Sequence, residues 1–225
     1  MWASLVDFIS QSIQFFYILT LKLGIPNYGL AIILFTIVIK VILYPLTHKQ
    51  MDAMRKMQEL QPKIKEVQKK HKNDSQKSQQ AMMELYREHG ANPLSGCWPL
   101  LIQMPILFAL FRSLRVFFDP VQHPVYVNLT HASFFWVKNL GNADPFILPV
   151  LVGITTFLQQ KVTTTGTDQT QKTMLYVMPI FLAWVSRNFP GGLALYWVVF
   201  SILGTVQQIY INKQSTGVRE EAKGK

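Results

Sequence analysis

The side chains with most scope for chemistry are the few charged or polar ones that interrupt long apolar stretches. Lys40 lies inside such a stretch, which runs over residues 28–47. A lysine near the middle of a membrane helix costs about 2.5–3.5 kcal/mol, so such residues normally face protein or water. The alternative is snorkelling toward the headgroups, because Thr47 lies only seven residues further on. We favour an inward-facing charge, since polar partners occur on other apolar stretches.

Hydroxyl and amide side chains on these other stretches are the available partners. Gln159, Gln160, Gln207 and Gln208 lie where helices are expected to end, which is the commoner position for such residues. Others lie deeper, and each could form an interhelical hydrogen bond. Together they predict a wet, positively charged cavity in the inner half of a bilayer. The predicted groove residues are Lys40, Thr36, Gln103, Thr155, Thr156 and Ser201.

The sequence argues against an enzyme. None of the apolar stretches contains Asp, Glu or His, so an intramembrane protease, a zinc site or a carboxylate proton relay lacks its residues. No nucleotide-binding motif is present either. The single cysteine, Cys97, excludes an intrachain disulfide. We therefore expect no catalytic residue, no metal and no cofactor.

The elements that must position these residues are five apolar stretches, of roughly the twenty residues that cross a bilayer as a helix. Backbone groups cannot remain unpaired in lipid, so each stretch is predicted to be helical. The fold class expected is an all-α polytopic membrane protein with five transmembrane helices. Their predicted bounds are 28–47, 94–117, 146–161, 174–189 and 191–211.

The N-terminal segment, residues 1–27, has the pattern of a helix lying on a membrane surface. Trp2, Ile9 and Ile13 belong to an apolar series at helical spacing, with Asp7 and Gln11 in the opposing polar series. We predict an interfacial amphipathic helix followed by a turn. A sixth crossing is the alternative, which the polar residues near the start of the segment disfavour.

Residues 48–92 are crowded with charged side chains and contain two apolar stripes at three- and four-residue spacing. Two helices separated by a polar break predict an antiparallel hairpin. The stripes contain several methionines, whose flexible side chains adapt to varied apolar partners. Packing of the stripes on each other explains most of the pattern, and a soft docking surface is the functional alternative. The predicted docking residues are Met51, Met54, Met57, Met82 and Leu85.

The basic residues set the predicted orientation. Most of them occur in the hairpin, in the loop 162–173 with its flanking Lys161, and in the tail 212–225, which all lie on one side of a five-span topology. The positive-inside rule makes this side cytoplasmic and places the N-terminus and the loop 118–145 outside. The net charge of +10 thus reflects membrane orientation rather than nucleic-acid binding. The few basic residues on the other side are Lys22, Arg112, Arg115, Lys138 and Arg187.

Several motifs together resemble those of the YidC/Oxa/Alb membrane protein insertases. The run from Asn92 to Pro105, NPLSGCWPLLIQMP, is similar to the second-span signature of that family. The run from Tyr44 to Thr47 with that from Met57 to Lys63 is similar to the start of its cytoplasmic hairpin, and Phe189 to Trp197 with Gln207 and Gln208 is similar to its last span. The motifs follow in the family's order over almost the whole chain.

This resemblance implies five core spans, a cytoplasmic hairpin and a hydrophilic groove that opens to cytoplasm and lipid. Lys40 matches the groove's cationic residue, which is arginine in most bacterial relatives, and Ser201 stands where many relatives have asparagine. Lysine keeps the charge but lacks the planar fork of arginine. Tyr196 and Trp197 are candidate apolar contacts for substrate, and ordinary packing or anchoring at the membrane interface is the alternative for both.

The function expected is that of a membrane protein insertase or chaperone in the bacterial cytoplasmic (inner) membrane. Lys40 would attract acidic residues of a nascent protein, whose hydrophobic span then slides into lipid. The expected partners are nascent membrane proteins, membrane lipid, the Sec translocon and the ribosome, without specific nucleic acid or small-molecule cofactor. A small-solute transporter or channel and a structural subunit of a membrane complex are the alternatives.

Overall fold

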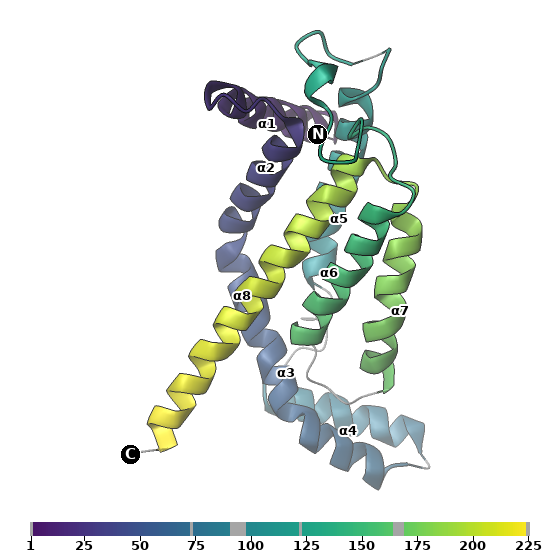
Figure 1. The fold of residues 1–225 in the computed structure, drawn as a ribbon. Coiled ribbons are helices and arrows are strands. Elements are labelled where there is room, and N and C mark those ends of the chain that lie inside the picture. Colours follow the sequence, from purple (N-terminus) through teal and green to yellow (C-terminus); the bar gives the residue numbers. More distant parts are fainter. Residues whose placement is uncertain (1, 73, 91–97, 122, 164–168, 224–225) are drawn as a thin grey trace. The chain divides into compact units, whose positions relative to one another are not determined.

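The chain is helical throughout the parts that the computed structural model describes, which are residues 2–72, 74–90, 98–121, 123–163 and 169–223. Within these ranges the β-structure is limited to two isolated bridges, so the predicted all-α class is confirmed. The helices, labelled in Figure 1, are α1 (Trp2–Lys22), α2 (Tyr28–Ile42), α3 (Tyr44–Lys70), α4 (Ser75–Glu88), α5 (Trp98–Phe117), the 3₁₀ turn η2 (Leu129–His131), α6 (Ile147–Thr163), α7 (Gln169–Ser186) and α8 (Gly191–Lys223).

One predicted helix needs correction. The stretch 28–47 was expected to be one helix, but α2 ends at Ile42 and α3 begins at Tyr44. Pro45 lies in the first turn of α3, where a proline is tolerated because its missing N–H has no helical acceptor there. The apolar part of α8 is Gly191–Asn212, and the helix continues to Lys223 through the predicted cytoplasmic tail 212–225.

The chain divides into two compact units. The first contains residues 1–42 and 105–225, and the second contains residues 43–104. Helix α5 crosses the division at Pro105, a proline inside the helix.

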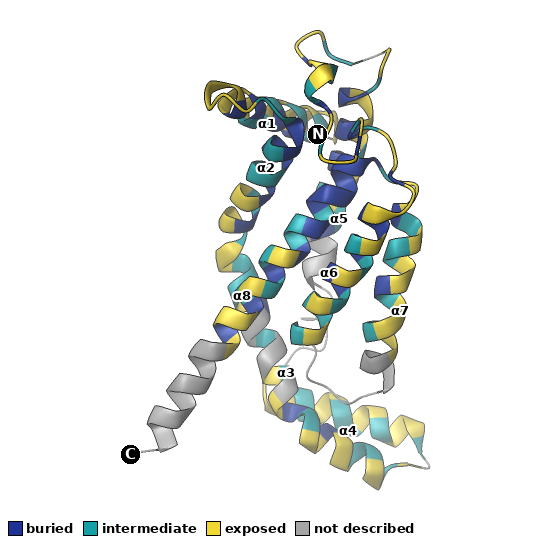
Figure 2. Cartoon of the chain, viewed as in Figure 1, coloured by how far each residue is buried: buried dark blue, intermediate teal, exposed yellow. Residues whose placement is uncertain are grey.

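In the first unit, α8 is the central helix. It packs against α2 and α6, while α6 also packs against α7, and α1 packs against α2. The first turns of α8 are buried (Figure 2). Gly192 allows this close packing, because a Cβ there would lie 3.0 Å from Ile32 of α2 and 3.2 Å from Leu114 of α5.

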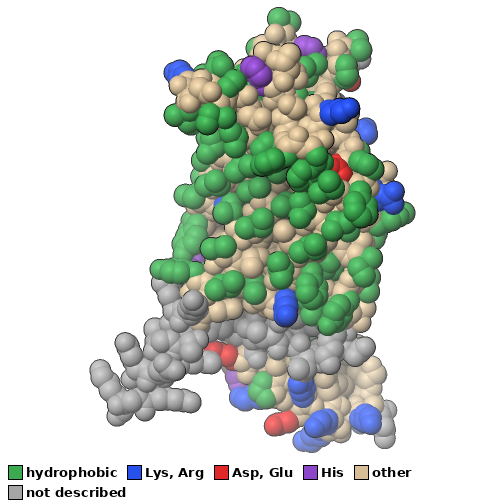
Figure 3. All heavy atoms as spheres, in the orientation of Figure 1, with side chains coloured by type: hydrophobic (Ala, Val, Ile, Leu, Met, Phe, Trp, Pro, Cys, Tyr) green, Lys and Arg blue, Asp and Glu red, His purple; other side chains and the backbone are tan. Residues whose placement is uncertain are grey.

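The outside of the first unit is unusually apolar. Many large hydrophobic side chains are exposed on α6, α7 and α8, including Ile154, Phe181, Trp184 and Val206. Figure 3 shows one face on which hydrophobic side chains dominate and charges are few. A water-soluble surface seldom carries so extensive an apolar patch, whereas a lipid-facing one does.

By length and hydropathy, two of the described helices are long and apolar enough to cross a membrane, namely Trp2–Lys22 and Gly191–Asn212. A third is added if α2 and the start of α3 count as one broken span. Ile147–Thr163 and Thr173–Ser186 are shorter apolar helices.

The loop between α5 and α6 caps one end of the first unit. Tyr17 of α1 stacks on Tyr28 of α2 at 4.0 Å between ring centroids, and its hydroxyl lies 2.6 Å from Nδ1 of His131. Asp144 accepts hydrogen bonds of 2.8 Å from the backbone N–H groups of Phe146 and Ile147, at the start of α6. These contacts fix where α1, α2 and α6 begin or end.

The second unit consists mainly of α3 and α4, which pack against each other. Leu60 and Ile64 of α3 are buried. Lys63 Nζ of α3 lies 2.7 Å from Nε2 of His89, just after α4. Asp74 caps α4 by accepting a hydrogen bond of 3.0 Å from the backbone N–H of Lys77.

Candidate functional site

Lys40 lies in the interior of the first unit, although it carries a charge. Its side chain extends from α2 toward α8, and the residue is only 9% exposed. The ammonium nitrogen lies 3.6 Å from the centre of the Phe200 ring of α8. Aromatic rings attract cations at this distance, so Phe200 covers the amine and stabilises it.

Gly204, one turn after Phe200, provides the space for this amine. A Cβ at Gly204 would lie 3.1 Å from Lys40 Nζ and would clash with the side-chain amide of Gln159 on α6. The amine of Lys40 and the amide of Gln159 therefore approach α8 at the same glycine. A charged residue of α2 is thus enclosed by α8 and α6.

The charge of Lys40 has no carboxylate partner among the described residues. Burial of an unpaired ion costs several kcal/mol even after the protein relaxes. A desolvated cation–π contact returns about 2 kcal/mol of this cost. The remaining cost argues that the charge is retained for function rather than for stability.

The hydroxyl groups predicted to line the groove are already partly engaged. Thr36 donates to the carbonyl of Ile32 at 2.6 Å, and Thr155 donates to the carbonyl of Leu151 at 2.7 Å. Such bonds to the preceding turn shield a hydroxyl inside an apolar environment. Because these hydroxyl groups already donate to the backbone, the lining offers a substrate fewer hydrogen-bond donors than the number of hydroxyl groups suggests.

Thr156 joins two helices. Its Oγ1 accepts a hydrogen bond of 3.0 Å from the indole N–H of Trp197, which links α6 to α8. Thr156 is buried and Trp197 is half-buried. Both were predicted as site residues on separate grounds, and the structure brings them into direct contact.

Tyr196 and Ser201 lie on the buried side of α8. Tyr196 is fully buried, and its ring stacks on that of Phe200 with 5.7 Å between centroids. Ser201 is 1% exposed, next to Phe200 in the chain. Tyr196 is thus connected to Lys40 through the Phe200 ring.

A band of amides follows along α6 and α8. The side-chain oxygens of Gln160 and Gln208 are buried, and neither has a hydrogen-bond partner among the described residues. Gln208 donates to Asn212 at 3.0 Å, and Asn212 donates to the carbonyl of Val162 at 3.4 Å. Buried acceptors without a protein donor are normally satisfied by water, so this band favours a hydrated region.

The other predicted site residues belong to the second unit. Gln103 is buried on α5. Met57, Met82 and Leu85 are half-buried, and the sulfur of Met82 accepts a hydrogen bond of 3.7 Å from Gln68. Met51 and Met54 occur in α3, but their side chains lie outside the described residues.

Phe200, Gly204 and Gln159 were not among the predicted site residues. A signal existed in α8, where Tyr196, Phe200 and Gly204 recur every fourth residue and so share one helix face. This spacing was not recognised as a functional signal, because Phe and Gly in an apolar stretch are usually packing residues. Only their position beside Lys40 gives them a role.

The exposed apolar helices and the enclosed cation define a helical membrane protein that keeps a charge inside its helix bundle. The family model described as "60Kd inner membrane protein" matches residues 19–219. The chain belongs to this family.

Two curated relatives share the name "Membrane protein insertase YidC". The protein of Fusobacterium nucleatum is 44% identical over 191 residues, which are 84% of this chain and 88% of that protein. The protein of Geotalea daltonii is 42% identical over 214 residues, which are 94% of this chain. The chain spans only 38% of the length of this second relative.

A solved structure gives the same result for the fold. The chain is similar to a crystal structure described as an active YidC insertase with its first transmembrane domain resolved. The TM-score is 0.70 at 29% sequence identity, and the match covers 89% of this chain and 45% of that one.

Proposed function

We propose that this chain inserts nascent hydrophobic proteins into the bacterial inner membrane. Membership of the family and the shared name of the relatives support the activity. The observation that carries the mechanism is the Lys40 amine, which α2, α6 and α8 enclose and which has no carboxylate partner in the part of the chain that the structure describes. Such an unpaired cation is a ready binding partner for an acidic group of a substrate.

The proposed topology has five spans, an outside N-terminus and a cytoplasmic C-terminus. In this arrangement α3 and α4 form a cytoplasmic helical hairpin, and α1 lies at the outer surface. The uneven distribution of basic residues supports the orientation. In Figure 1, α1 lies across the end of α2 instead of alongside it, which supports an interfacial position.

The groove is proposed to open beside Lys40, and Phe200 is its cover. The ring occupies the space immediately next to the amine, so a substrate carboxylate can reach Lys40 only after Phe200 has turned aside. The unpaired amide oxygens of Gln160 and Gln208 favour water near the cytoplasmic ends of α6 and α8. That water lowers the cost of bringing a polar segment into the bilayer.

The hydrophobic segment of the substrate is proposed to leave sideways into lipid. Burial of its apolar surface in hydrocarbon drives this step, so no nucleotide is required. Trp197, which is half-buried, is a proposed contact on α8, and the fully buried Tyr196 would join it once Phe200 has turned aside. The half-buried Met57, Met82 and Leu85 would receive the nascent chain in the cytoplasm. The Sec translocon and the ribosome are the proposed partners.

The test compares Lys40→Leu with Lys40→Arg in vesicles that receive a substrate with an acidic external tail. Opposite charges at about 4 Å attract by about 4 kcal/mol at an intermediate dielectric constant, so Lys40→Leu should strongly reduce insertion. Lys40→Arg retains the charge and should retain most of the activity. Neutralising the acidic tail of the substrate should remove the difference between the variants.

Normal insertion of every substrate by folded Lys40→Leu would refute the mechanism. A flux assay with liposomes that contain only this protein separates the insertase from a transporter or channel. We expect no solute flux. Sustained flux that Lys40→Leu abolishes would favour the transporter.

A further inference from the structure

We propose that the α1–α5 corner of the first unit binds one anionic glycerophospholipid through Arg112 and Arg115. This inference rests on the proposed topology, which places the end of α5 at the outer surface. It concerns a site distant in sequence from Lys40, and nothing in the insertion mechanism requires it.

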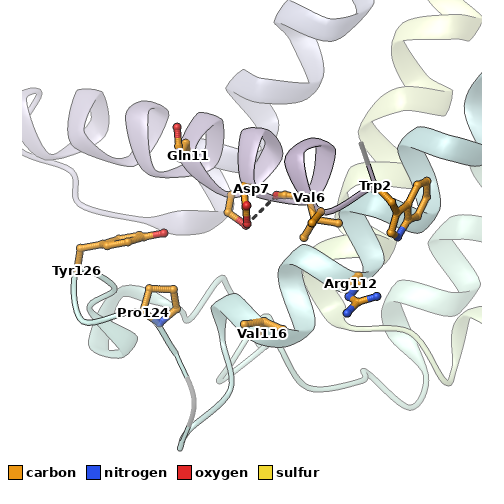
Figure 4. A pocket seen from close by; sticks show the side chains of 10 residues that line it. Trp2, Val6, Asp7, Gln11, Arg112, Val116, Pro124 and Tyr126 are labelled. Atoms are coloured by element: carbon orange, nitrogen blue, oxygen red, sulfur yellow. Dashed lines mark hydrogen bonds between the residues drawn. The ribbon is translucent and has the colours of Figure 1, made fainter.

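Two adjoining cavities form the site. One of about 330 Å³ lies between α1, α5 and the following loop, and it is lined by both polar and apolar residues, among them Asp7, Gln11 and Tyr126. The other, of about 520 Å³, is lined by aromatic and aliphatic side chains and by two arginines. Trp2, Arg112 and Val116 line both cavities, so the two are continuous at these residues. Figure 4 shows the first cavity with Trp2 and Arg112.

The contact between α1 and α5 gives the site a defined wall. Ser10 of α1 and Ser113 of α5 share a hydrogen bond of 2.7 Å, and Ser113 is fully buried. Arg112 lies next to Ser113 in the chain, so this bond fixes its backbone relative to Trp2 on the same helix as Ser10. The hydrogen bond between α1 and α5 therefore positions part of the cavity lining.

The positive charge of the site favours an anionic ligand. Arg112 and Arg115 both line the second cavity, and neither forms an ion pair among the described residues. The Arg115 guanidinium lies 4.9 Å from the centre of the Phe111 ring, a contact that orients it but leaves its charge uncompensated. Two guanidinium groups are well suited to a phosphate, because each can donate two parallel hydrogen bonds to its oxygens.

The apolar part of the second cavity favours a hydrocarbon chain. Phe108 and Phe111 lie on the same cavity as the arginines, and Phe108 is 57% exposed. Arg115 and Arg112 precede the last residue of α5, Phe117, by two and five residues, which is about 3 and 7.5 Å of helix. In the proposed topology this is the depth of lipid phosphates, and Phe108 lies deeper, at the level of acyl chains. Trp2 and Tyr126 are residue types that prefer this interface.

A ligand with a phosphate at one end and an acyl chain at the other matches both halves. The two arginines outnumber the one carboxylate of the site, Asp7, so a lipid with net negative charge should bind better than a zwitterionic one. Bound there, it would link α1 to α5 beyond the single bond between Ser10 and Ser113.

The experiment measures lipid binding to the detergent-purified full chain by native mass spectrometry and by thermal shift. Phosphatidylglycerol is compared with phosphatidylcholine, with diacylglycerol and with inorganic phosphate. The variants are Arg112→Gln/Arg115→Gln and, as a matched control, Arg187→Gln, because Arg187 is exposed and lines neither cavity.

We expect the wild type and Arg187→Gln to retain phosphatidylglycerol, and the double variant to bind it roughly tenfold more weakly or worse, as expected for lost charge-assisted hydrogen bonds. A folded Arg112→Lys/Arg115→Lys variant should fall between them. Equal binding by the double variant would refute the site. Equal binding of diacylglycerol, or equal stabilisation by inorganic phosphate, would refute a phospholipid as the ligand. Insertion activity is not measured, so failure here is distinct from failure of the proposed function.

Discussion

Lys40, Phe200 and Gly204 form one cluster between α2 and α8. The charge of Lys40 is covered by the Phe200 ring, and Gly204 leaves room for the amine. The charge could be found from sequence, because a lysine stands out in an apolar stretch. The ring and the glycine could not, because their importance comes from a contact between α2 and α8, which are far apart in the chain. The engaged hydroxyls of Thr36 and Thr155 also required the structure.

At this scale, Phe200→Leu should expose the Lys40 amine. The substitution keeps an apolar side chain and removes the ring, so about 0.5–2 kcal/mol of cation–π stabilisation is lost. Acetylation of Lys40 in membranes, followed by peptide mass spectrometry, should proceed faster than in the wild type. Phe200→Tyr keeps the ring and is the control. Equal acetylation rates in all three proteins would show that the ring does not limit access.

Gly204→Ala should disturb the same cluster of Lys40, Phe200 and Gly204 by taking up the space beside the amine. The added methyl would displace the ends of the flexible Gln159 and Lys40 side chains, which can turn aside. Alanine also favours the helix over glycine by about 0.5–1 kcal/mol, so we expect only a small net loss of stability. Thermal unfolding in detergent would show this loss as a lower Tm. The double variant Gly204→Ala/Gln159→Ala removes the closest clash and should recover part of it. Without any such recovery, Gln159 would not be the residue that limits space at Gly204.

At the scale of the helices, apolar length and spacing predicted the α-helices in the described ranges, because an apolar stretch in lipid must satisfy its own backbone groups. The 3₁₀ turn Leu129–His131 was not predicted. The residues at which the helices begin and end were harder to predict. The break between α2 and α3 at Leu43 and the extension of α8 to Lys223 were both missed. A proline in an apolar stretch is compatible with a kink in one helix and also with the first turn of a new helix, so the sequence did not reveal the break. The residues after Ile211 are polar, which suggested the end of the span, but polar residues can continue a helix.

The joint between α6 and α8 can be tested through Thr156. Thr156→Val keeps the shape of the side chain but leaves the indole N–H of the half-buried Trp197 without its acceptor. Hydrogen bonds between membrane helices contribute about 0.6–1.7 kcal/mol, and the free energy of unfolding should fall by this amount. Titration with a denaturing detergent measures it. Thr156→Ser keeps the acceptor, so a loss as large in this variant would assign the effect to packing.

The start of α4 depends on Asp74. The backbone N–H of Lys77 donates to its carboxylate and holds the pKa of Asp74 below its ordinary value. A depressed pKa means that the charged form stabilises the folded helix, so this contribution is present at neutral pH and is lost as the pH falls through the pKa of the folded state. In Asp74→Ala, the amides of Ser75–Glu88 should exchange hydrogen faster at neutral pH. The variant and the wild type should converge in acid.

Asp74→Asn is the matched control for this effect. Asparagine keeps a capping oxygen without the charge, so α4 should stay protected and lose its dependence on pH. Unchanged exchange in Asp74→Ala would mean that packing on α3 alone determines the start of α4.

For the whole molecule, the question is how many helices cross the membrane. Length and hydropathy qualify α1 as a span, although its position across the end of α2 supports an interfacial helix. The sequence left the same two options open, because α1 has one polar side and enough apolar residues to cross. Buried Ile9, Ile13 and Tyr17 account for one side of α1, and exposed Phe8 and Phe15 account for another. Hydropathy does not distinguish a helix that faces protein and lipid in the membrane plane from one that crosses it.

Labelling of introduced cysteines with a membrane-impermeant thiol reagent decides between five and six crossings. In a Cys97→Ala background, Ser133→Cys in the exposed loop before α6 should react in intact cells, and Ser78→Cys in α4 should react only after permeabilisation. Ser4→Cys, near the start of α1, is the discriminating variant. An interfacial α1 keeps both of its ends outside, so Ser4→Cys should react in intact cells like Ser133→Cys. If it reacts only after permeabilisation while Ser133→Cys keeps its behaviour, α1 crosses the membrane and the N-terminus is cytoplasmic, which would also remove Trp2 from the outer interface.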